Sequence, residues 1–155
     1  MKPGQGSGKP GQDPLREFAR VCAAKQRIDR LHAREVLFAI GDRALAADEA
    51  GAQELAARVR ELSSARAEEW QLAVRDEILM ASTEHVRSVD PRFLSRPDYD
   101  LHYTVEARAA LEARLRAAEL LGIEIQSSVL ERVAAADRLL EPLLRAGEPP
   151  EGPRG

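Results

Sequence analysis

The sequence has few aromatic residues and almost no cysteine. Phe, Trp and Tyr together make up 4% of the 155 residues, and Cys22 is the single cysteine. One cysteine cannot form a disulfide within its own chain, which argues against a small disulfide-stabilised fold. There is also no apolar run near the start, and none long enough to cross a bilayer. We therefore expect a cytoplasmic protein with no signal peptide and no contact with a membrane.

The motifs of common catalytic centres are missing as well. The chain contains no Gly-x-Ser-x-Gly, Cys-x-x-Cys or His-Glu-x-x-His motif, so nucleophilic and zinc chemistry have no recognisable basis. The segment "GQGSGKPG" near the start fails as a phosphate loop, because Pro10 follows Lys9 where such a loop needs Ser or Thr. We favour a non-catalytic protein over an enzyme and expect no cofactor.

What the chain has in abundance is Ala, Leu, Arg and Glu. Charged residues make up 32% of the sequence, and this composition is typical of long helices with a solvent-facing side. The Gly- and Pro-rich ends, 1–13 and 147–155, are predicted to be disordered tails around one helical domain, 14–146. Only three of the 23 basic residues are lysine, which suggests a G+C-rich, bacterial genome.

The spacing of apolar residues predicts a long first helix over 14–47. Asp13 and Pro14 are suited to the N-cap and the first helical position. Leu31, Phe38 and Leu45 follow at intervals of seven residues, as in the seam of a coiled coil. Gly41 lies inside this pattern, at a cost of roughly 1 kcal/mol relative to alanine, and allows a kink.

A second long helix is predicted over 52–89, after a turn in which Asp48 or Glu49 can cap it. Its apolar stripe includes Leu55, Leu62, Trp70 and Val74. Residues 1–47 carry nine basic and five acidic side chains, and residues 48–89 carry five basic and nine acidic ones. Opposite net charges of +4 and −4 favour pairing of the two helices as an antiparallel hairpin.

A shorter hairpin is predicted in the remainder of the chain. Asp90-Pro91 ends the second helix, and a connector over 90–103 leads to a helix over 104–121 with Thr104 as its N-cap and Gly122 after its end. A capping box, Ser128 with Glu131, opens a last helix over 128–145. The predicted fold is all-α: a long antiparallel hairpin plus a shorter C-terminal hairpin, resembling a four-helix bundle in its organisation.

Polar and aromatic side chains gather in the connector, in the segment "RPDYDLHYTVE". Asp98, Tyr99, Asp100, His102 and Tyr103 lie within six residues. Carboxylates next to the start of a helix are favoured by its unpaired N–H groups without any catalytic role. A histidine between acids is also suited to proton donation. We favour a packed, capped corner and keep a functional corner as the alternative.

A metal site is a further alternative, because helical bundles hold metal ions with carboxylate and histidine ligands. The candidate ligands are His32, Glu35 and His102, although no histidine follows a glutamate by three residues. A nucleic-acid site is not expected. Residues 118–133 have the Ala-x-x-x-Gly spacing of a helix-turn-helix motif, but the second helix has no excess of positive charge.

The function that the sequence favours is protein–protein interaction. We expect an adaptor, assembly subunit or chaperone-like module whose long hairpin associates with itself, giving a homo-oligomer, or binds another protein. The alternative is a helical-bundle enzyme or metal-binding protein that uses His32 and Glu35 or the corner from Asp98 to His102. The residues expected at the interface share the apolar stripes of the two long helices: Leu31, Phe38, Leu45, Leu55, Leu62, Trp70 and Val74.

Overall fold

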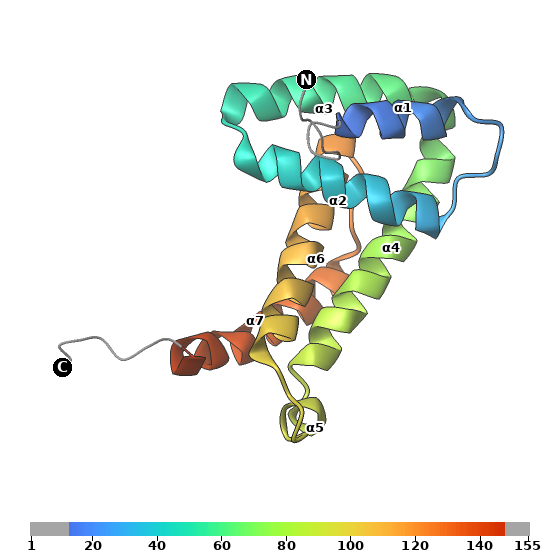
Figure 1. The fold of residues 1–155 in the computed structure, drawn as a ribbon. Coiled ribbons are helices and arrows are strands. Elements are labelled where there is room, and N and C mark those ends of the chain that lie inside the picture. Colours follow the sequence, from blue (N-terminus) through green and yellow to red (C-terminus); the bar gives the residue numbers. More distant parts are fainter. Residues whose placement is uncertain (1–12, 148–155) are drawn as a thin grey trace, which may run out of the picture. The chain divides into compact units, whose positions relative to one another are not determined.

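A computed structural model describes residues 13–147, and every regular element in that range is a helix (Figure 1). The all-α class is therefore confirmed. The predicted tails fall almost entirely on 1–12 and 148–155, which lie outside the described residues. Among those that are described, no helix is long and apolar enough to cross a membrane. The elements in chain order are α1 (Pro14–Ala23), α2 (Arg30–Ala46), α3 (Glu49–Ser63), the 3-10 turn η1 (Ser64–Arg66), α4 (Ala67–Ser88), α5 (Pro91–Leu94), α6 (Leu101–Leu121) and α7 (Ser127–Gly147).

The described chain divides into two compact units. The first contains 13–78 and 112–124, and the second contains 79–111 and 125–147. Helices α1, α2 and α3 belong wholly to the first unit, and α5 and α7 to the second. Helices α4 and α6 contribute residues to both.

The helix predicted over 14–47 is divided into α1 and α2. Helix α1 ends at Ala23, and α2 starts afresh at Arg30 with Asp29 as its N-cap. The Asp29 carboxylate accepts a hydrogen bond from the His32 N–H at 3.1 Å, and the His32 ring nitrogen accepts one from the Asp29 N–H at 3.2 Å. This reciprocal cap works like a capping box, with histidine where glutamate or glutamine is usual. Because histidine stands at this position, the usual capping-box pattern does not predict the start of α2.

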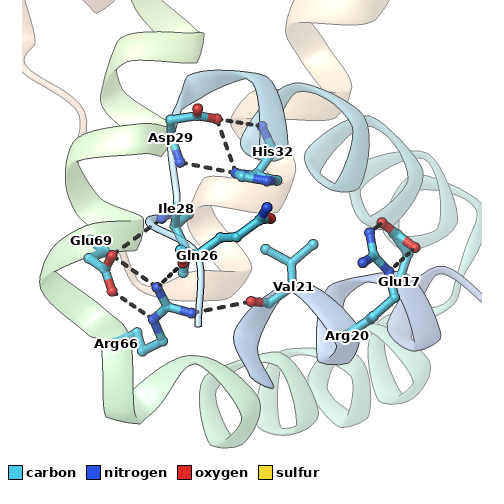
Figure 2. A network of polar contacts seen from close by, with 9 residues as sticks. All are labelled: Glu17, Arg20, Val21, Gln26, Ile28, Asp29, His32, Arg66 and Glu69. Atoms are coloured by element: carbon cyan, nitrogen blue, oxygen red, sulfur yellow. Dashed lines mark hydrogen bonds and ion pairs between the residues drawn. The ribbon is translucent and has the colours of Figure 1, made fainter. Parts of the chain in front are cut away.

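The loop between α1 and α2 is held by Arg66 of η1 (Figure 2). Its guanidinium donates to the Ala24 carbonyl at 2.6 Å, and also to the carbonyls of Val21, Cys22 and Gln26. Glu69 binds the same guanidinium and accepts a hydrogen bond from the Ile28 N–H at 3.2 Å. The hydrogen bonds from Arg66 and from Ile28 lower the pKa of Glu69. The carbonyls at the end of α1 thus find their partners in a side chain more than forty residues away.

The helix predicted over 52–89 is also divided, at η1. It begins earlier than expected, because Asp48 caps α3 by accepting a hydrogen bond from the Gly51 N–H at 2.8 Å. At the division, the Ser64 hydroxyl donates to the Glu61 carbonyl at 3.1 Å, and Ser63 makes a similar contact with Arg60. Serine hydroxyls that bond back to the preceding turn bend helices. The two long helices of the prediction are therefore four helices.

The core of the first unit includes a tilted pair of aromatic rings and a very close approach of two helices. Phe18 and Trp70 are buried, with ring centroids 4.8 Å apart. Gly41 lies in an unbroken α2, and a Cβ atom built on it would stand 1.7 Å from the Ala113 carbonyl oxygen of α6. The glycine that the sequence pattern treats as a weakness is the point at which α2 and α6 touch through their backbones.

The second unit has its own small core, formed by Val89, Ala136 and Leu140. Helix α6 starts at Leu101, where the Asp100 carboxylate accepts a hydrogen bond from the His102 N–H at 3.0 Å. Thr104 is therefore not the N-cap. It is buried inside the helix, and its hydroxyl donates to the Ser88 carbonyl at 3.2 Å.

The ends of α6 and α7 are close to the predicted ones. Helix α6 ends at Leu121 as expected, with Gly122 at φ +73°, a conformation that glycine adopts without a steric penalty. Helix α7 starts at Ser127, one residue before the predicted start at Ser128.

Candidate interaction surface

The seam predicted on α2 lies on the outside of the first unit. Leu31, Phe38 and Leu45 are 58%, 45% and 47% exposed. The opposite side of the same helix is the buried one, through Ala33, Val36, Leu37, Ile40 and Ala44. Helix α2 therefore carries two apolar faces, of which the folded chain covers one.

A groove of about 570 Å³ lies beside Phe38, between the first turn of α1 and the outer face of α2. Its apolar lining comes from Pro14, Val36, Phe38 and Ala39. Its charged lining comes from Asp13, Glu17, Glu35, Asp42 and Arg43. The groove thus joins apolar surface to an excess of carboxylates.

Two of these carboxylates already have partners within the chain. Asp13 caps α1 by accepting from the Leu15 N–H at 3.0 Å, and it lies 3.6 Å from the Arg43 guanidinium. Glu17 pairs with Arg20, and the hydrogen bond from that guanidinium lowers the pKa of Glu17.

Glu35 and Asp42 are different. Both are exposed, and neither makes a side-chain hydrogen bond or ion pair with any residue from 13 to 147. They lie seven residues apart on α2, with Phe38 between them. The outer face of α2 therefore presents two carboxylates that have no ion-pair partner among the described residues, on either side of the exposed Phe38 ring.

The other residues that were expected at an interface are buried or half-buried in the fold. Leu55, Trp70 and Val74 are buried in the first unit, and Leu62 is half-buried. A polar substitution at Trp70 or Val74 would test folding, whereas Leu31, Phe38 and Leu45 are accessible to a partner.

The three candidate metal ligands have different surroundings. The His32 ring takes part in the cap of α2, and Glu35 lines the groove. His102 is exposed and lies 3.1 Å from Glu106, on the next turn of α6. Within the described part of the chain, no three His, Cys, Asp or Glu side chains are gathered in a way that could hold a metal ion.

The segment from Asp98 to Tyr103 packs around Phe93 of α5. The ring of Phe93 lies 5.6 Å from the rings of both Tyr99 and Tyr103, measured between centroids. The Arg96 guanidinium lies over the same ring at 5.8 Å and pairs with Asp98 at 3.3 Å. With Asp100 capping α6, the named side chains of this corner have contacts that serve its packing.

Sequence patterns missed a buried polar cluster in the second unit. His85 of α4 is completely buried, and its Nε2 lies 2.8 Å from Asp137 of α7. Arg108 of α6 donates to both oxygens of the same carboxylate, at 2.8 and 3.2 Å. The signal was available, because His85 is seven residues after Ile78 and four before Val89, within the apolar stripe of α4. No solvent reaches the His85 ring, so this histidine is suited to stabilising the fold.

The directions of the two pKa shifts in this cluster favour one protonation state. Burial lowers the pKa of His85 and outweighs the opposing effect of Asp137. Burial acts to raise the pKa of Asp137, but the hydrogen bonds from Arg108 and His85 together lower it. These directions favour an ionised Asp137 that accepts a hydrogen bond from the Nε2–H of a neutral His85 ring. The Nδ1 atom of His85 is then a buried acceptor with no hydrogen-bond partner among residues 13–147.

The lowered pKa of His85 predicts that the protein loses stability below neutral pH. The unfolded chain takes up a proton on this histidine near pH 6.5, whereas the folded chain resists it, so stability present above that pH is lost as the pH falls toward the folded pKa. We expect the free energy of unfolding, measured by urea denaturation, to decrease between pH 7.5 and pH 5.5, and His85→Gln to flatten this dependence. The exposed His102→Gln is the matched control and should leave it unchanged. A steep dependence that persists in His85→Gln would assign the effect to another group.

A second buried network lies in the first unit. Glu77 of α4 is 4% exposed and accepts from Arg30 at 3.1 Å and from Arg114 of α6 at 2.7 Å. Arg114 also donates to the Arg34 carbonyl at 3.3 Å, and its guanidinium lies over the Phe38 ring at 5.5 Å. Glu77 falls seven residues after Trp70, so an acid inside the apolar stripe of α4 was again the signal that the sequence offered.

Comparison with known proteins gives no relative from which a function could be carried over. A scan against protein-family models finds no match, and neither do searches of curated proteins and of solved structures.

Proposed function

We propose that this protein is a non-catalytic helical protein–protein interaction module, and that it binds through the outer face of α2. The observation that carries the proposal is the exposure of Leu31, Phe38 and Leu45, three large apolar side chains at heptad spacing on one helix. Single exposed apolar residues are normal on a protein surface. A regular stripe is the feature by which one helix packs along another.

Covering this face would supply part of the binding energy of a complex. Complete burial of a leucine or phenylalanine side chain contributes about 1.5–3 kcal/mol, and these three side chains are each about half exposed. Phe38 lies at the centre of the stripe, where interface residues contribute most. A partner that covers the stripe thus gains most from Phe38.

The proposal predicts that Phe38→Ser weakens association while the protein stays folded. Loss of a central aromatic anchor costs about 2 kcal/mol or more, equivalent to about a 30-fold weaker Kd. The assay is native mass spectrometry of the full chain purified gently from its own cells, followed by titration of the complex found there. Circular dichroism would check that the variant is folded.

Leu72→Ser is the matched control, because Leu72 is 66% exposed on α4 and lies outside the α2 stripe. It should bind like the unaltered chain. A protein that carries neither a second copy nor a partner, or a Phe38→Ser variant that associates as before, would contradict the proposed function.

A further inference from the structure

We propose that the occupant of the groove beside Phe38 is a cationic helical segment of another protein. This segment would place two basic side chains on Glu35 and Asp42, and an apolar side chain between them against Phe38. The inference rests on the proposed function and specifies the chemistry of the partner.

The spacing on α2 favours a helix as the partner. Residues seven apart in a helix lie two turns apart on nearly the same face, about 10.5 Å along the axis. Phe38 falls three residues after Glu35 and four before Asp42, so the three side chains lie along one side of α2. A partner helix with two lysines or arginines seven residues apart and an apolar residue between them has the complementary spacing.

The charges of the groove favour a basic partner. Glu35 and Asp42 form no ion pair within the described residues, and the carboxylates of Asp13 and Glu17 line the same groove. Arg43 is the single cation of the lining, and it is paired with Asp13. The groove therefore has an unbalanced negative charge, which attracts cations and repels anions.

The same charges oppose a second copy of this chain. If two α2 helices packed antiparallel about Phe38, Glu35 of one copy would lie level with Asp42 of the other. In a parallel pair, each carboxylate would lie level with its own counterpart. Both arrangements bring like charges together, which is unfavourable at close range.

The probe is a synthetic peptide of about 20 residues, long enough for five to six helical turns. It carries two lysines seven residues apart around a central leucine, and a fluorescent label for anisotropy measurements with the full chain. The comparison peptide has the same apolar residues, with glutamate in place of each lysine. We expect the cationic peptide to bind, the acidic one to bind at least tenfold more weakly, and added salt to reduce the difference.

The double variant Glu35→Gln and Asp42→Asn should bind the cationic peptide about tenfold more weakly than the unaltered chain. Its matched control is the double variant Asp76→Asn and Glu131→Gln, which removes two exposed carboxylates with no partner among the described residues. The control should bind normally.

The outcomes separate this inference from the proposed function. No binding of the cationic peptide, equal binding of both peptides, or undiminished binding by the Glu35→Gln, Asp42→Asn variant would overturn the cationic partner. A homodimer that Phe38→Ser disrupts would also overturn it, because the occupant would then be a second copy. In each of these cases, the native mass spectrometry of Phe38→Ser decides independently whether the α2 face binds a protein.

Discussion

Gly41→Ala is expected to lower the free energy of unfolding by about 3 kcal/mol or more, or to prevent folding of the first unit. The added Cβ atom would stand 1.7 Å from the Ala113 carbonyl oxygen and 2.4 Å from its carbon, and both are backbone atoms that cannot rotate away. Helices α2 and α6 would have to separate, which removes contacts along their whole interface. Urea denaturation followed by circular dichroism measures the loss.

This result would run against intrinsic helix propensity. Alanine is favoured over glycine in a helix by roughly 1 kcal/mol, so propensity alone predicts a more stable protein. Gly51→Ala is the matched control. Its added Cβ would meet the Asp48 carboxylate oxygen at 3.1 Å and the Ala47 Cβ at 3.3 Å, neighbours that need to move by only a few tenths of an ångström. If both variants had similar stability, the close contact of α2 with α6 would be disproved.

Glu77→Ala is expected to cost about 3–5 kcal/mol. Removal of one member of a buried ion pair is strongly destabilising, and Arg114, which is 8% exposed, would lose its 2.7 Å contact with the Glu77 carboxylate. Arg30 would lose the same partner, although it is more exposed and can turn to solvent. The measurement is the midpoint and slope of urea unfolding. Asp76→Asn, the exposed neighbour without a partner among the described residues, should change stability by less than about 0.5 kcal/mol.

A double variant tests the origin of that cost. Replacing both Glu77 and Arg114 with methionine removes the two charges together and keeps most of the volume, so it should be less damaging than Glu77→Ala. If the double variant were worse than the single one, packing and not the loss of the Glu77 charge would be responsible.

The sequence predicted best what depends on neighbouring residues. The all-α class follows from composition and periodicity, and the caps by Asp13 and Asp48 and the stop at Gly122 follow from local hydrogen bonding and backbone conformation. The break between α1 and α2 depends on a histidine in an unusual capping role and on the remote Arg66. No sequence pattern within the loop predicts the histidine cap or the contact with Arg66.

Periodicity also identified the apolar stripe on α2 without showing which side of the helix the fold would cover. Both faces of α2 are apolar, and the fold buries the face that carries Val36, Leu37 and Ile40. Leu31, Phe38 and Leu45 remain exposed on the other face. The buried clusters around Glu77 and His85 were not predicted from the sequence, for a related reason. A charged residue within an apolar stripe gains its partner from another helix, and helical periodicity carries no information about that partner.

The way Arg66 holds the loop before α2 has a consequence for mutational tolerance. Its guanidinium contacts backbone carbonyls, which every amino acid possesses, so the side chains at Ala24 and Gln26 carry little of the information that shapes the loop. The loop conformation depends on Arg66 itself, and lysine, with one compact ammonium group, cannot donate to several carbonyls at once as the guanidinium does. Random substitutions at Ala24 and Gln26 are therefore expected to have little effect on stability. Substitutions at Arg66, which is remote from the loop in the sequence, are expected to destabilise the fold.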